Sequence, residues 1–354
     1  MAGQQSLRRL AGTSLAALAL VSVAFGCGPA RNPSATIEPE PGTEAGAEPT
    51  LLDEPEPEPP PPPQCLARTP RGGPSLIPDG AAWLVHVAPR ELLSSQAWAS
   101  LMQGRPMPGQ LSDLEDAFAR CGVSLNQVDH ILFGFDPDTD DGTLVATGPR
   151  LGQPEVATCL ATSIEWLSNS LEPNAQPVAE TAADDPQVRV FDIADDRVYL
   201  FHPDMVVLTS GSERAEVEAL SRCEGYPAID HGLGELVRRI DTQAPVWFAG
   251  RLTPEMATSM ESSLSLDPGT MRDVILSARV ESGLAVQARL GASSPSGALA
   301  VEAAIGNLMP MLQTLGPAEL QQAVQRIEFE TLGAELMIQA SLTHSELGHL
   351  SAMF

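Results

Sequence analysis

Residues 75–354 of this chain predict an α+β fold with mostly antiparallel sheets and helices packed on one face. The first observation is a series of strand-like segments joined by tight turns, such as Ile275–Val280 followed by Leu284–Leu290. The second is the alternation of apolar and polar residues in Leu284–Leu290. Gln287 and Arg289 lie on its polar side, as in a strand with one exposed face. The third is the helical spacing of apolar residues between the strand pairs.

The first half, residues 75–225, begins with a buried strand, Ala82–Val87, that ends before Pro89. Apolar residues at helical spacing predict helices over 90–103 and 111–121, and Gly122 ends the second helix. The remaining elements are strands at 131–135, 143–147, 188–193, 198–201 and 205–208, and helices at 155–167 and 213–220.

The second half, residues 226–354, repeats this order from the strand Val246–Ala249, where Trp247 corresponds to Trp83. A helix follows at Thr253, then the hairpin around Ser282-Gly283. The later elements are a long helix at 298–315, a hairpin of 327–331 with 336–342, and a terminal helix from 343. On the long helix, Val301, Ala304, Ile305, Leu308, Leu312 and Leu315 share one face. Because both halves read strand, helix, two strands, helix, two strands, helix, we infer a degenerate internal duplication.

The chain is strongly acidic, with a formal charge of −26 and no lysine among its 20 basic residues. Removal of a signal peptide containing Arg8 and Arg9 would make the charge −28. Such a chain is repelled by phosphate backbones, so we expect no nucleic-acid partner.

The first 26 residues have the layout of a secretion signal. Arg8 and Arg9 precede an uncharged, largely apolar run, Ala11–Gly26, which is short for a membrane-spanning helix. This segment has two interpretations: a signal for ordinary secretion, or a signal after which lipid is attached to Cys27. The position of Cys27 at the expected cleavage point favours lipid attachment.

The segment Ala24-Phe25-Gly26-Cys27 resembles the lipobox of bacterial lipoproteins, although Phe25 and Ala24 depart from the commonest residues there. The resemblance covers about the first 30 residues. It implies a diacylglycerol thioether on Cys27, removal of residues 1–26 and acylation of the new amino end, for example with palmitate. It also implies a membrane partner through the lipid anchor and a location in the cell envelope. Gly28 after the cysteine favours the outer membrane under enteric-type sorting.

Residues 27–74 are expected to join this anchor to the body as a disordered spacer. Residues 31–64 contain eight acidic residues and one arginine, and Pro59–Pro63 form an unbroken proline run. Proline removes amide donors and like charges extend the chain, so a semi-rigid spacer reaching roughly 100 Å is expected. A proline-motif ligand for a partner domain is the alternative.

Four cysteines follow the lipidation candidate, and an even number in an exported chain suggests up to two disulfides. We expect Cys121–Cys159, because both cysteines lie on helices flanking one predicted hairpin. Cys65–Cys223 would then join the start of the body to its middle. Other pairings remain open, and none of the cysteines has the C-x-x-C spacing of a zinc or redox site.

No metal, cofactor or catalytic set is predicted. Asp136–Gly142 resembles a calcium loop, but its glycine comes one place late and Thr147 stands where the twelfth-position glutamate belongs, so a plain hairpin turn is favoured. None of the six histidines forms H-x-x-x-H. Ser212 fits a helix N-cap better than a hydrolase nucleophile. Phosphate-binding glycine motifs are absent from the sequence, and its few aromatics argue against a carbohydrate groove.

Three functions remain for the body. We favour a non-enzymatic envelope lipoprotein with a binding or structural role and an unknown envelope protein partner. A binding module for an apolar or lipid-like ligand, held between a sheet and the helix at 298–315, is the first alternative. Met256, Met260, Met309 and Met311 could line its cavity, although packed helix faces explain these residues equally. A hydrolase with an unrecognised site is the second.

Overall fold

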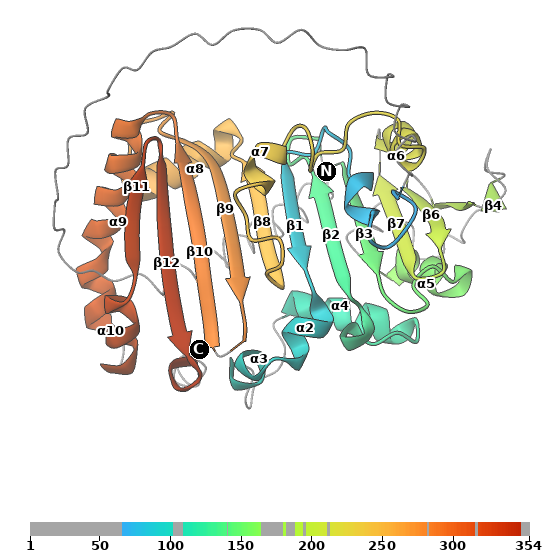
Figure 1. Ribbon diagram of the computed structural model, residues 1–354, viewed down its shortest axis with the longest axis horizontal. Helices are drawn as coiled ribbons and strands as arrows, with labels where there is room; N and C mark the ends of the chain where they lie inside the picture. The colour runs from blue at the N-terminus through green and yellow to red at the C-terminus, as the bar shows by residue number, and fades with distance from the viewer. Residues whose placement is uncertain are drawn as a thin grey trace, which may run out of the picture. The chain divides into compact units, whose positions relative to one another are not determined.

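One antiparallel sheet carries the strands of both predicted halves. The structure is a computed structural model that describes residues 66–101, 109–139, 141–163, 180–181, 188–193, 196–210, 213–281, 283–315 and 318–347. Within these ranges, twelve strands lie in the order β11-β12-β10-β9-β8-β1-β2-β3-β7-β6-β5-β4 (Figure 1). Each of the eleven neighbouring pairs is antiparallel. The predicted α+β class and antiparallel sheet are confirmed.

The elements follow the predicted order closely. The strands are β1 (Trp83–Val87), β2 (His130–Phe135), β3 (Gly142–Thr147), β4 (Glu180–Thr181), β5 (Arg189–Ile193), β6 (Asp196–His202), β7 (Met205–Ser210), β8 (Val246–Arg251), β9 (Met271–Arg279), β10 (Gly283–Ala292), β11 (Glu328–Leu332) and β12 (Glu335–Thr343). The helices are η1 (Gly73–Leu76), α2 (Pro89–Ser94), α3 (Gln96–Leu101), α4 (Gly109–Arg120), η2 (Leu125–Gln127), α5 (Pro154–Ser163), α6 (Arg214–Ser221), α7 (Gly234–Val237), α8 (Pro254–Leu264), α9 (Pro295–Leu315) and α10 (Ala318–Gln325).

The same order of strands occurs in both halves of the sheet. Starting from the centre, the first half runs β1-β2-β3-β7-β6 and the second half runs β8-β9-β10-β12-β11. The two halves meet where β1 pairs antiparallel with β8, with Trp83 opposite Gly250 and His86 opposite Trp247. Both halves therefore build the same five-strand order outward from one central pair.

The register of this central pair shows that Trp83 and Trp247 are not equivalent. Side chains opposite each other in an antiparallel pair share a face, and faces alternate along a strand. Trp83 shares its face with Gly250, and Trp247 shares the other face with His86. The two indoles consequently pack in different cores, Trp83 with Phe248 and Trp247 with His86. The prediction that Trp247 corresponds to Trp83 is therefore wrong, because the two side chains lie on opposite faces of the sheet.

Helices cover one face of the sheet in both halves. We call it the helical face. In the first half, Phe118 of α4 and Leu160 of α5 pack against Leu144 of β3. In the second half, Val301 and Ile305 of α9 pack against strand residues that include Leu276, Leu290, Leu336 and Ile338, and α8 adds Met256 and Met260 at the edge of this core.

The first half is also covered on the opposite face, which the prediction of helices on one face did not include. Leu76 of η1, Val217 of α6 and Leu236 of α7 pack there. All six residues of β3 are buried, and only Ser210 of β7 is not. Apolar side chains on both sides of a strand need a cover on both sides, as the sequences of β3 and β7 require.

The long helix α9 differs from its prediction in one residue of its buried face. Val301, Ile305 and Met309 are buried at spacings of four residues, whereas Leu308 is 41% exposed. Leu308 is not on the side of the helix that faces the sheet, which is formed by residues four positions apart, Val301, Ile305 and Met309. The side chains of Leu312 and Leu315 lie outside the described residues, as does that of Met311. Met309 is fully buried and Met256 and Met260 are partly buried, as core packing predicts.

Candidate functional site

The side of the second half that faces away from α8 and α9 has polar, partly exposed side chains. We call this surface the open face; it consists of the outward residues of β10, β12 and β11, with Ser277 and Arg279 of β9 at its margin. The other outward residues of β9, Asp273 and Ile275, are buried. β12 alternates between buried and more exposed residues along its length, and β11 alternates between exposed and half-buried ones. Figure 1 shows β9, β10 and β12 in front of α8. This pattern is the opposite of that in β3 and β7, which occupy the corresponding places in the first half.

The antiparallel register sets the open face in rows that cross the strands. Ser277 of β9 lies opposite Gln287 of β10, which lies opposite Gln339 of β12. Gln339 in turn lies opposite Glu328 on the edge strand β11. Strands are spaced by about 4.8 Å, so this row of hydroxyl, amide and carboxylate groups is roughly 14 Å long.

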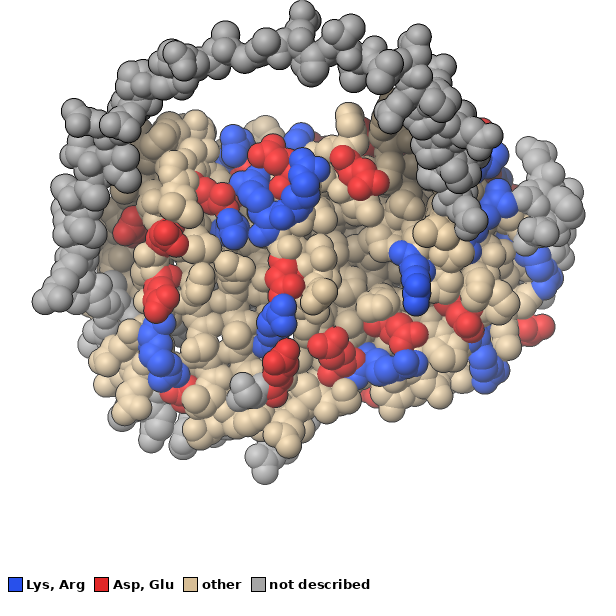
Figure 2. All heavy atoms as spheres, in the orientation of Figure 1, with Lys and Arg blue, Asp and Glu red and all other residues tan. Residues whose placement is uncertain are grey.

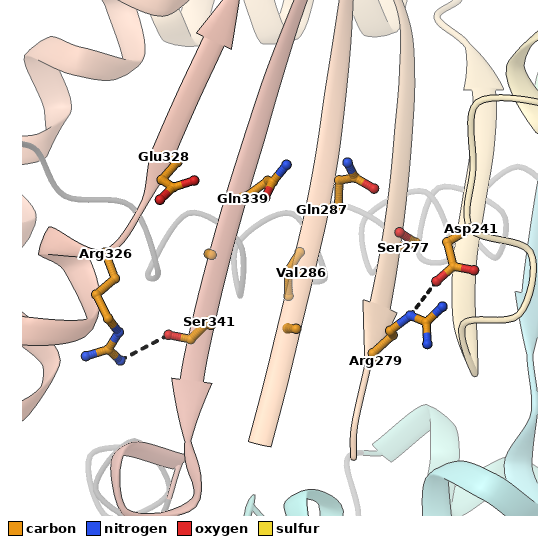
Figure 3. A pocket seen from close by; sticks show the side chains of 11 residues that line it. Asp241, Ser277, Arg279, Val286, Gln287, Arg326, Glu328, Gln339 and Ser341 are labelled. Atoms are coloured by element: carbon orange, nitrogen blue, oxygen red, sulfur yellow. Dashed lines mark hydrogen bonds and ion pairs between the residues drawn. The ribbon is translucent and has the colours of Figure 1, made fainter. Parts of the chain in front are cut away.

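The row forms the floor of an open groove of about 300 Å³. Figure 3 shows Gln287 and Gln339 rising from neighbouring strands, with Asp241 and Arg279 at one side of the groove and Arg326 at the other. Arg279 Nε donates to Asp241 Oδ2 at 2.5 Å. Arg326 Nη2 donates to the backbone oxygen of Ser341 at 3.2 Å. The groove is therefore bordered by charged groups that already have partners.

The floor itself keeps hydrogen-bonding capacity free. The amide nitrogens of Gln287 and Gln339 approach Met337 Sδ at 3.3 and 3.6 Å, and thioether sulfur is a weak acceptor. Among the described residues, the carboxamide oxygens of both glutamines accept no hydrogen bond. Ser277 is only 6% exposed, and within the same residues its hydroxyl has no hydrogen-bond partner. A polar ligand or protein surface can satisfy these groups.

Arginines gather where the open face meets α7. Arg239 Nη1 and Arg289 Nη1 lie 3.0 and 3.4 Å from the two carboxylate oxygens of Glu335. Figure 2 shows blue side chains over α7 and the adjoining ends of β8 and β9. Arg251 donates to the backbone oxygen of Gly232 at 2.8 Å. This part of a strongly acidic protein has a local concentration of positive charge.

Glu213 and His86 are buried ionisable groups that lie away from the groove. Burial, together with Asp141, Glu216 and Asp136, raises the pKa of Glu213 to about 7, although a hydrogen bond donated by Thr143 acts in the opposite direction. Thr143 also bonds to Thr209 at 2.9 Å. The carboxyl of Glu213 thus belongs to a closed network of hydroxyls at the ends of β3 and β7.

The second group is His86, in the middle of the sheet. Burial and then His130 lower the pKa of His86 to about 4, so it is neutral near pH 7. Its Nε2 lies 3.2 Å from His130 Nδ1, and its ring stacks on Trp247 with centroids 5.1 Å apart. The His86 ring thus lies within hydrogen-bonding distance of His130 and against a packed indole, as expected for a core histidine.

The motif with spaced aspartates is a hairpin turn. Phe135 of β2 pairs with Gly142 of β3, and Asp136 Oδ1 accepts a hydrogen bond from the amide of Asp138. Within the described residues no three His, Cys, Asp or Glu side chains group as metal ligands. Ser212 lies outside the described residues, and Glu213 occupies the N-cap position of α6.

The predicted disulfide Cys121–Cys159 is present and joins the end of α4 to α5. Cys223 is also disulfide-bonded. Its predicted partner, Cys65, and the lipidation candidate, Cys27, lie outside the described residues. No helix in the described parts of the chain is both long and apolar enough to cross a bilayer.

Sequence reasoning identified only part of the groove. It placed Gln287 and Arg289 outward but did not single out Ser277, Gln339 or Asp241. The alternation of Glu335–Thr343 could have identified Gln339, whereas the position of Asp241 depends on long-range pairing of β8.

No family model matches this chain, and no curated protein sequence matches it either. Among solved structures, crystal form III of TP0453 has a TM-score of 0.41 and 11% sequence identity, and it covers 78% of this chain and 97% of its own. Crystal form I of TP0453 has a TM-score of 0.41 with 9% identity, covering 79% and 96%. A similarity of this size supports no functional conclusion, so the chain is defined by its own architecture: an α+β protein with one antiparallel sheet and one open polar face.

Proposed function

We propose that this chain is a lipid-anchored, non-enzymatic protein of the cell envelope that binds a polar partner through its open face. The observation that carries the proposal is the difference between the two related halves. The strands β3 and β7 are buried on both faces, whereas β12 and β11 alternate and, with Gln287 of β10, present a polar row. A sheet face that stays polar and exposed in one half, but is apolar and covered in the other, is suited to a partner.

The groove favours hydrogen bonding over catalysis. Its lining combines carboxamides and hydroxyls with two arginines and two acids, Arg279, Arg326, Asp241 and Glu328. Glu213, whose pKa is strongly raised, is tied to Thr143 instead of facing the groove. A lining that mixes charged and neutral hydrogen-bonding groups is suited to binding a polar partner, which supports a binding role over the alternative of a hydrolase.

The alternative of an apolar ligand between sheet and α9 has less support. Val301, Ile305 and Met309 fill the inner side of α9 and are 1%, 9% and 0% exposed. These side chains already contact the sheet core. We therefore place the binding surface on the open face.

A photo-crosslinking amino acid at Gln339 tests this placement in native envelopes. We expect a crosslinked species at this position and none with the same amino acid at Glu155, an exposed residue of α5 in the first half. Equal crosslinking at both positions, or none at Gln339, would contradict the proposal.

The anchor is tested separately. We propose that Cys27 is the acylated amino end and that the spacer 28–64 separates the body from an outer-membrane surface. Two or three acyl chains bind a bilayer durably, at ~0.8 kcal/mol per buried methylene. Intact mass of the detergent-extracted protein is expected to show a chain starting at Cys27 with added acyl mass, and Cys27→Ser is expected to release the protein from membranes. A Cys27→Ser chain that remains in the membrane fraction would refute the anchor.

A further inference from the structure

The open face has two unlike borders. On one side, the segment 238–241 follows α7 and lies beside β9, because Asp241 pairs with Arg279. On the other side, β11 ends the sheet and presents Glu328 and Glu330, which are both exposed. Arg238 is exposed in the first border. One border thus presents the positive charge of Arg238, and the other presents the negative charges of Glu328 and Glu330.

Asp241 and Arg326 at these borders are already paired, with Arg279 and Glu346 respectively, but other charges there are not. In the described part of the chain, neither Glu328 nor Glu330 forms an ion pair, and Arg238 also has none. Arg251, which is exposed at the end of β8, makes only a hydrogen bond to a backbone oxygen. A partner that brings an acidic edge to the arginines and arginines to the acidic edge would satisfy both borders at once.

We propose that this partner is a second copy of the same chain, docked open face to open face. The proposal rests on the proposed function of this face as a binding surface. A twofold axis parallel to the strands, between β10 and β12, places the 238–241 border of each copy beside β11 of the other. Glu328 and Glu330 of one copy then face Arg238 of its partner. A symmetric dimer requires a self-complementary surface of this kind.

The centre of the face is compatible with the same arrangement. Gln287 and Gln339 lie on the two strands that flank the axis. A carboxamide both donates and accepts hydrogen bonds, so it can pair with a carboxamide of an identical copy. The free carboxamide oxygens and the Ser277 hydroxyl would gain partners at such an interface.

Edge-to-edge pairing of β11 strands is disfavoured by the same charges. Two copies joined along β11 would place Glu328 and Glu330 near the same residues of the partner, and like charges across paired strands are destabilising. Charged side chains on an edge strand are a known protection against such pairing. The copies are therefore expected to meet through their faces.

The size of the surface predicts a weak dimer. Four strands at about 4.8 Å and ten residues of β10 at about 3.4 Å define a face that would bury at most roughly 1,300 Å² over two copies, near the lower limit of stable interfaces. Dissociation constants in the range of about 1–100 μM are usual for such transient contacts. High local concentration on a membrane would favour the dimer.

Sedimentation velocity of the mature chain carrying Cys27→Ser tests the proposal. We expect dimers at about 100 μM protein and low salt, and at least a tenfold rise in the dissociation constant at about 0.5 M salt, because the border charges are exposed. Glu330→Arg alone and Arg238→Glu alone should each weaken the dimer by about tenfold or more. The two substitutions together should restore most of the affinity, because the charges are exchanged.

Glu155→Arg is the matched control, since it makes the same charge change on α5 and should leave the dimer unchanged. A monomeric wild-type chain at these concentrations, or a double variant no tighter than the single variants, would overturn the dimer. If the chain is monomeric while Gln339 still crosslinks to a different polypeptide, the binding face stands and the second copy does not. If Gln339 crosslinks to nothing, the proposed function fails with it.

Discussion

The indole of Trp83 lies directly over Gly250, its opposite neighbour in the central strand pair. A β-carbon at position 250 would come within 2.1 Å of Trp83 Cδ2 and 2.3 Å of Cε3. The indole is 2% exposed and packs against Phe135 and Phe248, so it has no free space to move into. The join between the two halves thus depends on a glycine in one half and an indole in the other.

Gly250→Ala is expected to destabilise the fold because the added methyl group overlaps the Trp83 ring. Overpacking of this kind costs about 1–3 kcal/mol. Urea denaturation should show a lower midpoint. Gly306→Ala is the matched control, because a β-carbon there has nothing within 4 Å and the residue lies inside α9. The control should be neutral or stabilising by about 0.5–1 kcal/mol. Equal midpoints for Gly250→Ala and the wild type would show that the Trp83 contact is not rigid.

Replacing Cys121 and Cys159 together by serine is expected to lower the free energy of unfolding. The bridge spans a sequence separation of 38 residues. In the loop-entropy treatment a crosslink of this length contributes about 4 kcal/mol. The measurement is urea denaturation of the oxidised wild type and the double variant. A double variant with an unchanged midpoint would contradict a structural role for the bridge joining α4 and α5.

Glu213→Gln is expected to change the pH dependence of stability. The pKa of Glu213 is raised from 4.5 to about 7, so the folded state binds the proton more tightly than the unfolded state. Protonated Glu213 therefore stabilises the folded wild type by up to about 3 kcal/mol below about pH 4.5. This contribution to the free energy of unfolding is lost as the pH rises through about 7.

Glutamine remains neutral and can keep a hydrogen bond with Thr143. The stability of Glu213→Gln relative to wild type should thus increase between pH 4.5 and 7 and stay constant above pH 8. Glu155→Gln, on the surface of α5, is the control and should show no such trend. A difference between Glu213→Gln and wild type that does not vary with pH would mean that Glu213 titrates normally.

Local pattern was sufficient to predict the elements and the hairpins. The alternation in Leu284–Leu290 predicted that Gln287 and Arg289 point outward, and they do so on β10. The apolar runs of β3 and β7 contain the signal for a second cover, because neither strand alternates. The prediction of helices on one face therefore missed the cover of the second face by η1, α6 and α7, although α6 itself agrees with the helix expected at 213–220.

Long-range pairing was not predictable from local pattern. Nothing near Val246–Arg251 indicates that this strand pairs with β1, more than 150 residues earlier in the chain. The register of that pair decides which face each tryptophan occupies, and a shift of one residue reverses the faces. The groove depends on three further registers that align Ser277, Gln287, Gln339 and Glu328, so its existence required the structure.

Accessibility of a single engineered thiol on the open face shows whether a partner occupies this surface in the cell envelope. Gln339→Cys and, as control, Glu155→Cys would be treated with a bulky maleimide, first in purified protein and then in intact native envelopes. We predict that both thiols react in dilute purified protein, and that in envelopes position 339 is shielded while position 155 still reacts. If position 339 reacts as fast in envelopes as in dilute solution, nothing occupies the open face and this surface does not bind a partner.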